Sequence, residues 1–127
     1  MRKAVFGVVF SVWAAVGVAG DFNYDSPVTI EGILTSGTAD PSITADEKPH
    51  KFPALQLSAP ISVVCAPEDK ECQPESGISL LHLVLKQDQM DFFKKHKGSH
   101  VILSGELFHS DNANHYTSVL LDVKSVN

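Results

Sequence analysis

Hydrophobic and polar residues alternate along several stretches of the chain, and this alternation is the pattern of half-buried β-strands. It predicts a first strand over residues 28–34, in which Gly32 breaks the row of side chains and marks either a bulge or a sharp bend. A second strand covers residues 54–66. Pro60 interrupts its alternation, so we expect this strand to bend or to change its pairing there.

In the middle of the chain the spacing of apolar residues changes from that of a strand to that of a helix. Residues 77–86 form the most apolar segment, which predicts a third strand with both faces largely buried. Over residues 87–98 the spacing becomes helical, with Asp88 suited to the N-cap and Gly98 to the left-handed position after the last turn. Two more alternating runs predict a closing hairpin, with strands over residues 101–108 and 116–126.

The predicted order is β-β-β-α-β-β, with one short helix between strands three and four. This is the order of an OB-like five-stranded barrel, and glycines within the strands suit the tight coiling of a small barrel. A small open α+β sheet is one alternative, and a six-stranded sandwich is another if the second strand splits at Pro60. We therefore predict a mostly β, OB-like domain over residues 28–127, preceded by a flexible segment over residues 21–27.

The first twenty residues have the features of a signal peptide. Arg2 and Lys3 precede an uncharged apolar run that ends in small residues around Ala19. This run is shorter than a membrane-spanning helix requires, so we predict cleavage of residues 1–20 after Sec-type export. The expected location is the bacterial periplasm or the exterior, with membrane contact only before cleavage.

Charge narrows the choice of partners. The formal net charge is −5, and removal of residues 1–20 takes away two basic residues and no acid, which gives −7. Binding to a phosphate backbone needs clustered lysines and arginines, and here a basic cluster is confined to Lys94, Lys95 and Lys97 of the predicted helix. We expect no nucleic-acid partner and consider an envelope protein, a peptide or a carbohydrate instead.

The two cysteines, Cys65 and Cys72, both lie in the part predicted to be exported. In an oxidising compartment, a pair bracketing a short loop is most simply a structural disulfide. A metal site needs more thiols or nearby histidines, and a redox motif needs a C-x-x-C spacing, so both alternatives have less support.

The tip of the closing hairpin is rich in rings. With a loop of about five residues over 110–114, His109 and His115 stand nearly opposite each other, close enough to share a metal or a ligand. With Asp111 they form an incomplete zinc site, because zinc needs three or four fixed protein ligands. Simple packing of the rings is the plainer alternative, and we predict no cofactor.

In an OB barrel, ligands bind near the loops between strands one and two and between strands four and five. In this chain those loops are residues 35–53 and 109–115, and both carry ring side chains beside polar neighbours. The two cysteines are expected to be paired and the chain has no G-x-S-x-G motif, so we predict no catalytic residues. The candidate ligand-binding residues are His50, Phe52, Phe108, His109, His115 and Tyr116.

The C-terminal hairpin also resembles a known family. The run from Gly105 to His109, GELFH, and the run from His115 to Val123, HYTSVLLDV, resemble the G-x-L-F and H-x-T-x-V-L-L signature of the bacterial domain-of-unknown-function family 4431. The resemblance is clear over residues 77–126. It departs from the family where a single His115 stands in place of a run of histidines. It implies a small exported domain and no particular reaction.

These observations favour an exported, non-catalytic binding module that engages an envelope macromolecule or ligand through residues 35–53 and 109–115. A small inhibitor or immunity protein of an exported enzyme or toxin is the alternative. A metal-binding protein that uses His109 and His115 is a third, weaker hypothesis.

Overall fold

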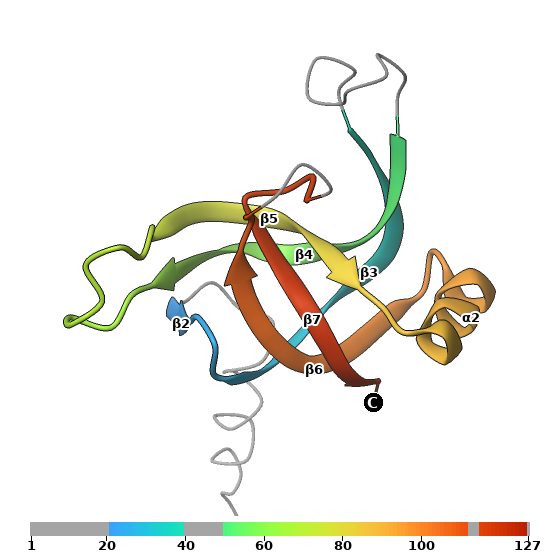
Figure 1. Cartoon of the computed structure of the whole chain (residues 1–127). Coiled ribbons are helices and arrows are strands. Elements are labelled where there is room, and N and C mark those ends of the chain that lie inside the picture. The colour runs from blue at the N-terminus through green and yellow to red at the C-terminus, as the bar shows by residue number, and fades with distance from the viewer. Residues whose placement is uncertain (1–20, 40–49, 112–114, 127) are drawn as a thin grey trace, which may run out of the picture.

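In the part of the chain that the structure describes, five long strands close into a barrel, to which one short strand and one helix are added (Figure 1). The computed structural model describes residues 21–39, 50–111 and 115–126. The predicted signal peptide, residues 40–49 of the first predicted binding loop and residues 112–114 of the second lie outside the described residues. The elements are β2 (Asp21–Asn23), β3 (Pro27–Ala39), β4 (His50–Val64), β5 (Glu75–Val84), α2 (Gln87–His96), β6 (His100–His109) and β7 (Val119–Val126).

The pairing of the strands confirms the predicted fold class. β3 pairs antiparallel with β4 and with β6, β4 pairs antiparallel with β5, and β6 pairs antiparallel with β7. A parallel pairing of β5 with β7 closes the barrel, and α2 and β6 supply the long connection that parallel strands need. This closed arrangement is the OB-like barrel, and neither the open α+β sheet nor the sandwich is formed.

β3 bends where it exchanges partners. Its residues 27–33 pair with β6 and its residues 32–39 pair with β4, so the two ladders overlap at Gly32 and Ile33. Neither ladder shifts register there, so of the two alternatives for Gly32 the bend is observed and the bulge is not. A Cβ atom at Gly32 would overlap the carbonyl oxygen of Gln56, so the absence of a side chain lets the β4 backbone approach.

β4 changes its pairing near Pro60, as predicted. Its register with β5 shifts between Gln56 and Ile61, and residues 62–64 beyond the shift pair with β2. The segment 21–27, expected to be flexible, contains β2, which runs parallel to β4, and Tyr24, which bridges to Leu107. The free edge of β4 offers unpaired backbone groups, and nothing in the local sequence shows that residues 21–23 will satisfy them.

The first predicted binding loop is shorter than expected. Residues 35–39 extend β3 and residues 50–53 extend β4, because these polar residues continue the antiparallel ladder beyond the barrel. The two described ends of the connection predicted over residues 35–53 therefore pair with each other and form one two-stranded arm. In Figure 1 this arm and residues 115–118 lie on the same, upper side of the barrel.

α2 contributes to the core through Phe93, and Met90 and Phe92 pack at the margin of that core. The prediction of Asp88 as N-cap was wrong: the N-cap is Lys86, whose backbone N–H donates to Oε1 of Gln89. Asp88 lies in the first turn instead, where a carboxylate still favours the helix dipole. Gly98 has a positive φ of 94°, as predicted.

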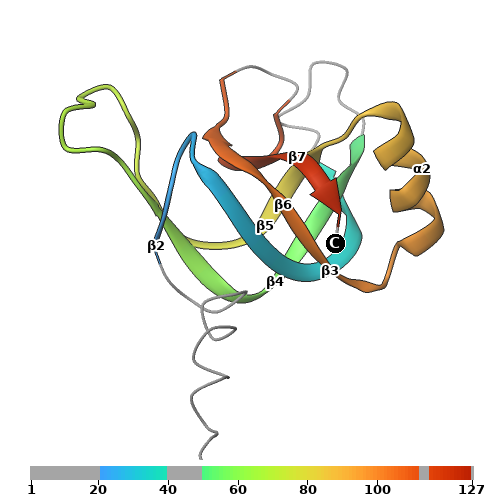
Figure 2. The same cartoon turned by 90° about the horizontal axis from the view of Figure 1, so that it is seen from below.

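Figure 2 shows α2 and the loop between β4 and β5 on opposite sides of the barrel. Within the part of the chain that the structure describes, no helix has the length and apolar character needed to span a membrane.

Candidate functional site

A second, smaller apolar cluster lies outside the barrel interior, on the outer face of β4 and β5. Side chains alternate along a strand, so Leu55 and Leu81 point into the main core while their neighbours point outward. On the outer face Phe52 and Ala54 are buried, with Leu80 and Tyr116 packed against them. Tyr116 comes from the connection between β6 and β7, so that connection covers part of this face.

Six ring side chains meet around this cluster. The His82 and Tyr116 rings stack at 7° with their centroids 5.6 Å apart, and the Phe52 ring lies 4.8 Å from His82 and 5.4 Å from Tyr116. Further contacts place His50 6.1 Å from Tyr116, and His115 6.4 Å from His82 and 5.4 Å from Phe108. We call this set the ring cluster: His50, Phe52, His82, Phe108, His115 and Tyr116.

Phe52 owes its position to a glycine on the neighbouring strand. Gly37 of β3 is the ladder partner of Phe52, and a methyl group built at Gly37 would overlap the Phe52 ring. An aromatic ring lying over a cross-strand glycine is a known way to cover backbone that lacks a side chain. Gly37 thus leaves room for the Phe52 ring, which packs against Tyr116 at an angle of 41° between the ring planes.

His82 connects the ring cluster to the β6–β7 connection by two hydrogen bonds. The backbone N–H of Tyr116 donates to Nδ1 of His82 at 3.3 Å, and the backbone N–H of His82 donates to Oγ1 of Thr117 at 3.1 Å. Burial, and then the neighbouring His115, lower the pKa of His82 to about 4. His82 is therefore a neutral hydrogen-bond acceptor at neutral pH.

His115 lies against the other end of the same connection. Its Nδ1 accepts a hydrogen bond from the backbone N–H of Asp111 at 3.1 Å and lies 3.2 Å from Oδ1 of the same residue. Only 15% of its side chain is exposed. The imidazole is thus held by Asp111 on one side and by the Phe108 and His82 rings on the other.

His109 lies apart from the ring cluster, contrary to the prediction that it stands opposite His115. Its ladder partner is Val119, because β7 begins three residues later than predicted. Residues 116–118 leave the hairpin to cover the outer face of β5, where Tyr116 packs on Phe52 and Thr117 bonds to His82. That tertiary contact moves His115 away from His109.

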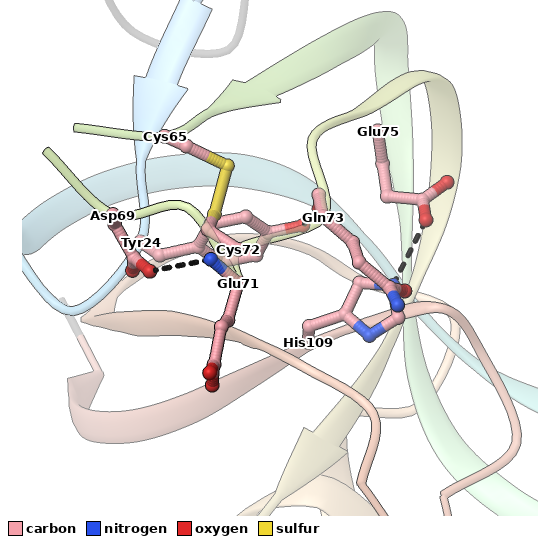
Figure 3. Close-up of a disulfide and its surroundings, with 8 residues drawn as sticks. All are labelled: Tyr24, Cys65, Asp69, Glu71, Cys72, Gln73, Glu75 and His109. Carbon is pink, nitrogen blue, oxygen red and sulfur yellow. Dashed lines mark hydrogen bonds and ion pairs between the residues drawn. A yellow bond between two sulfur atoms is a disulfide. The ribbon is translucent and has the colours of Figure 1, made fainter. Parts of the chain in front are cut away.

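His109 instead contacts the start of β5. Its Nε2 lies 2.9 Å from Oε2 of Glu75 (Figure 3). Its Nδ1 lies 3.0 Å from the carbonyl oxygen of Ser110. The hydrogen bond to Glu75 is the main reason that the pKa of His109 is raised above 6.5. Both nitrogens face atoms that only accept hydrogen bonds, so the site favours the imidazolium form.

The predicted disulfide between Cys65 and Cys72 is confirmed, with the two Cα atoms 5.9 Å apart. Beside it, the Tyr24 hydroxyl donates to the carbonyl oxygen of Gln73 at 2.7 Å (Figure 3). Burial, with a smaller effect of Glu75, raises the pKa of Tyr24 to about 12, so this phenol stays protonated.

Two pockets flank the disulfide. The larger, of about 310 Å³, has a wall that includes Tyr24, His109 and the carboxylates of Asp25, Asp69, Glu71 and Asp111. The smaller, of about 250 Å³, lies between β2 and the end of β4 and shares Cys72 with the first. The larger pocket therefore has several carboxylates beside His109, whose pKa is raised above its ordinary value.

The described residues contain no group of three or more histidines, cysteines, aspartates or glutamates placed to hold a metal ion. His109 and His115, the pair considered for a metal, have separate partners in Glu75 and Asp111. In the ring cluster, Nδ1 of His82 accepts a backbone hydrogen bond, which directs its proton to Nε2. Such a cluster offers ring faces and N–H donors to a ligand.

Five of the six residues proposed as ligand-binding come together in the ring cluster, and His109 does not. The sequence did not single out His82, which lies in the third predicted strand, as a candidate residue. The signal that points to it is its place in the alternation, on the outward row with Leu80 and next to the inward Leu81 and Leu83. Periodicity shows which face of the sheet a residue occupies, but it does not show which residues from other elements contact it.

The comparison with protein families agrees with the resemblance inferred from the C-terminal hairpin. The family model of Domain of unknown function (DUF4431) matches residues 80–127. The match includes most of β5, α2, β6 and β7, and with them four ring-cluster residues: His82, Phe108, His115 and Tyr116. A comparison with curated proteins gives no match.

Proposed function

We propose that this chain is a non-catalytic binding module, exported to the periplasm or beyond, that engages a macromolecule of the cell envelope through the ring cluster. One observation carries the proposal. Rings from β4, β5, β6 and the β6–β7 connection converge on the outer face of β4 and β5, next to the two connections that flank the binding face of an OB barrel.

The chemistry of the ring cluster suits a peptide, a protein surface or a carbohydrate. Tyr116, His50 and Phe108 are half-buried, so each keeps part of its ring in solvent for stacking on apolar side chains or on a sugar face. Imidazole N–H groups add hydrogen-bond donors that fix the orientation of a ligand. The net charge of −5 opposes a nucleic-acid backbone.

Peptide and glycan arrays probed with the mature protein test this proposal. Tyr116→Ala and His50→Ala remove rings from the cluster, and we expect each to weaken array binding at least tenfold. His100→Ala is the matched control, because His100 lies at the start of β6 with half of its side chain exposed and contacts Glu31. Equal binding by all four proteins, or no binding to either array, would refute the proposal.

A second candidate is an inhibitor of an exported enzyme or toxin. The loop between Cys65 and Cys72 is closed by the disulfide, exposes Asp69 and Glu71, and projects from the barrel on the side opposite α2 (Figure 2). A short, covalently closed acidic loop suits insertion into a basic cleft.

Native mass spectrometry of the protein isolated from its own compartment separates the two candidates. A stoichiometric second protein that is lost from the Asp69→Asn/Glu71→Gln variant and kept by Tyr116→Ala supports the inhibitor. The reverse pattern supports the ring cluster.

A further inference from the structure

His82 holds the middle of the segment His115–Ser118 on the outer face of β5 through its side chain and its backbone N–H, while Asp111 contacts His115 and the Ser110 N–H donates to the Ser118 carbonyl oxygen. The Tyr116 N–H donates to Nδ1 of His82, Oγ1 of Thr117 accepts from the His82 backbone N–H, and the His82 ring stacks on Tyr116. Oγ1 of Thr117 also donates to the carbonyl oxygen of Val119, where β7 begins. A change at His82 therefore acts directly on Tyr116 and Thr117, the two central residues of the segment.

The direction of the hydrogen bond at Nδ1 fixes the charge state of His82. A backbone N–H can only donate, so Nδ1 must present its lone pair to Tyr116 and the ring proton must lie on Nε2. A proton added to Nδ1 would place two donors against each other at a distance of 3.3 Å. The closed arrangement is thus specific for neutral His82.

The surroundings of His82 offer little compensation for a positive charge. From β4 it meets the Phe52 ring, and from the β6–β7 connection it meets Tyr116 and a second imidazole, His115. The Asp111 carboxylate pairs with His115, and His50 contacts the other side of Tyr116. Within the described residues His82 forms no ion pair, so protonation there would be opposed by both burial and His115.

We propose that His82 is a proton-operated latch of the ring cluster. In its neutral form it holds Tyr116 in place, and protonation of His82 releases the segment His115–Ser118, so that Tyr116 leaves the ring cluster. The latch rests on the direction of the hydrogen bond from Tyr116 and on the surroundings of His82, whereas its consequence for a ligand rests on the proposed function. A partner bound at neutral pH would be released in acid.

The dependence on pH has a definite sign. When the segment opens, His82 regains an ordinary pKa of about 6.5, while in the closed state its pKa is about 4. Between these values the open state takes up a proton that the closed state rejects, so the open population rises about tenfold for each unit by which the pH falls. Above about pH 6.5 the closed state keeps its full advantage.

Amide hydrogen exchange at Tyr116 measures the latch directly in the mature protein. We expect the protection factor, corrected for intrinsic exchange, to fall about tenfold per pH unit between pH 6.5 and 4. The amides of β7 serve as internal reference and should keep their protection, which shows that the opening is local. A Tyr116 protection factor independent of pH would overturn the latch.

Two variants make the test specific for His82. His82→Asn keeps an acceptor at the position of Nδ1 that does not titrate, so its Tyr116 protection should not vary between pH 6.5 and 4. His115→Asn removes the opposing imidazole, which raises the pKa of His82 in the closed state, so the loss of Tyr116 protection still begins near pH 6.5 but ends at a higher pH and is smaller in total. The wild-type slope in His82→Asn would overturn the proposal, and the His115→Asn result remains decisive if that variant fails to fold.

Amide hydrogen exchange can be measured without a binding partner. It therefore tests the latch independently of the proposed binding function. A flat exchange profile with normal array binding at pH 7 refutes the latch and leaves the binding face standing. A steep profile without array binding keeps the latch and refutes the proposed function.

Discussion

His109 and Glu75 join the end of β6 to the start of β5 through a 2.9 Å contact between Nε2 and Oε2. His82, in contrast, must be neutral to hold Tyr116. The two histidines are therefore shifted in opposite directions: the contact with Glu75 raises the pKa of His109, whereas burial and His115 lower the pKa of His82.

Glu75→Gln should destabilise the protein more in mild acid than in alkali. The pKa of His109 is raised by Glu75, so this pair contributes fully below about pH 6.5 and its contribution is lost as the pH rises through the folded-state pKa. Urea unfolding of wild type and variant at pH 6 and pH 9 measures this, with a larger difference in the free energy of unfolding expected at pH 6. His100→Gln, at an exposed pair, is the control and should change little at either pH. An equal loss at both pH values would contradict the assignment.

Gly37→Ala should disturb the ring cluster without touching a ring. The added methyl group overlaps the Phe52 ring, which must then shift from beneath Tyr116. We expect a loss of about 1–3 kcal/mol in the free energy of unfolding, typical of overpacking, together with weaker array binding. Thr38→Ala changes the next residue of β3, which is exposed, and is the control for a substitution on the same strand. Unchanged array binding by Gly37→Ala would show that the position of Phe52 is irrelevant to the ligand.

Gly105→Ala should be among the most damaging small substitutions in the barrel. Gly105 lies where β6 and β7 shift register, and its added Cβ would overlap the backbone carbonyl of Asp122. Backbone cannot move aside as a side chain can, so we expect a loss of about 2 kcal/mol or more. Thermal unfolding measures it, with Ser125→Ala on the facing strand as an exposed control. A melting temperature equal to that of wild type would contradict the close approach seen here.

Replacing Cys65 and Cys72 by serine should cost about 2 kcal/mol of stability, the loss expected for opening a short loop in the chain-entropy account. The acidic loop would lose its covalent closure, while the ring cluster lies on other elements. Denaturant unfolding should therefore show the loss, and array binding at pH 7 should persist. Loss of array binding would show that the two regions are coupled.

The order of the elements and the class of the fold follow from local pattern. Alternation over residues 28–34, 54–66 and 101–108 marks strands, and the change of period after residue 86 marks the helix. The disulfide also follows, because a six-residue loop leaves its two cysteines few alternatives. These features depend on residues close together in the chain, which is why periodicity and spacing reveal them.

The composition of the candidate site depended on contacts between distant residues. Tyr116 bonds to His82 and His109 bonds to Glu75, each across 34 positions of sequence. The two contacts decide that His115 turns toward the ring cluster and His109 toward the disulfide, although the hairpin pattern alone places them face to face. A local period shows which residues share a face. Only the pairing of β5 with β7 and the burial of Tyr116 over Phe52 determine which faces meet.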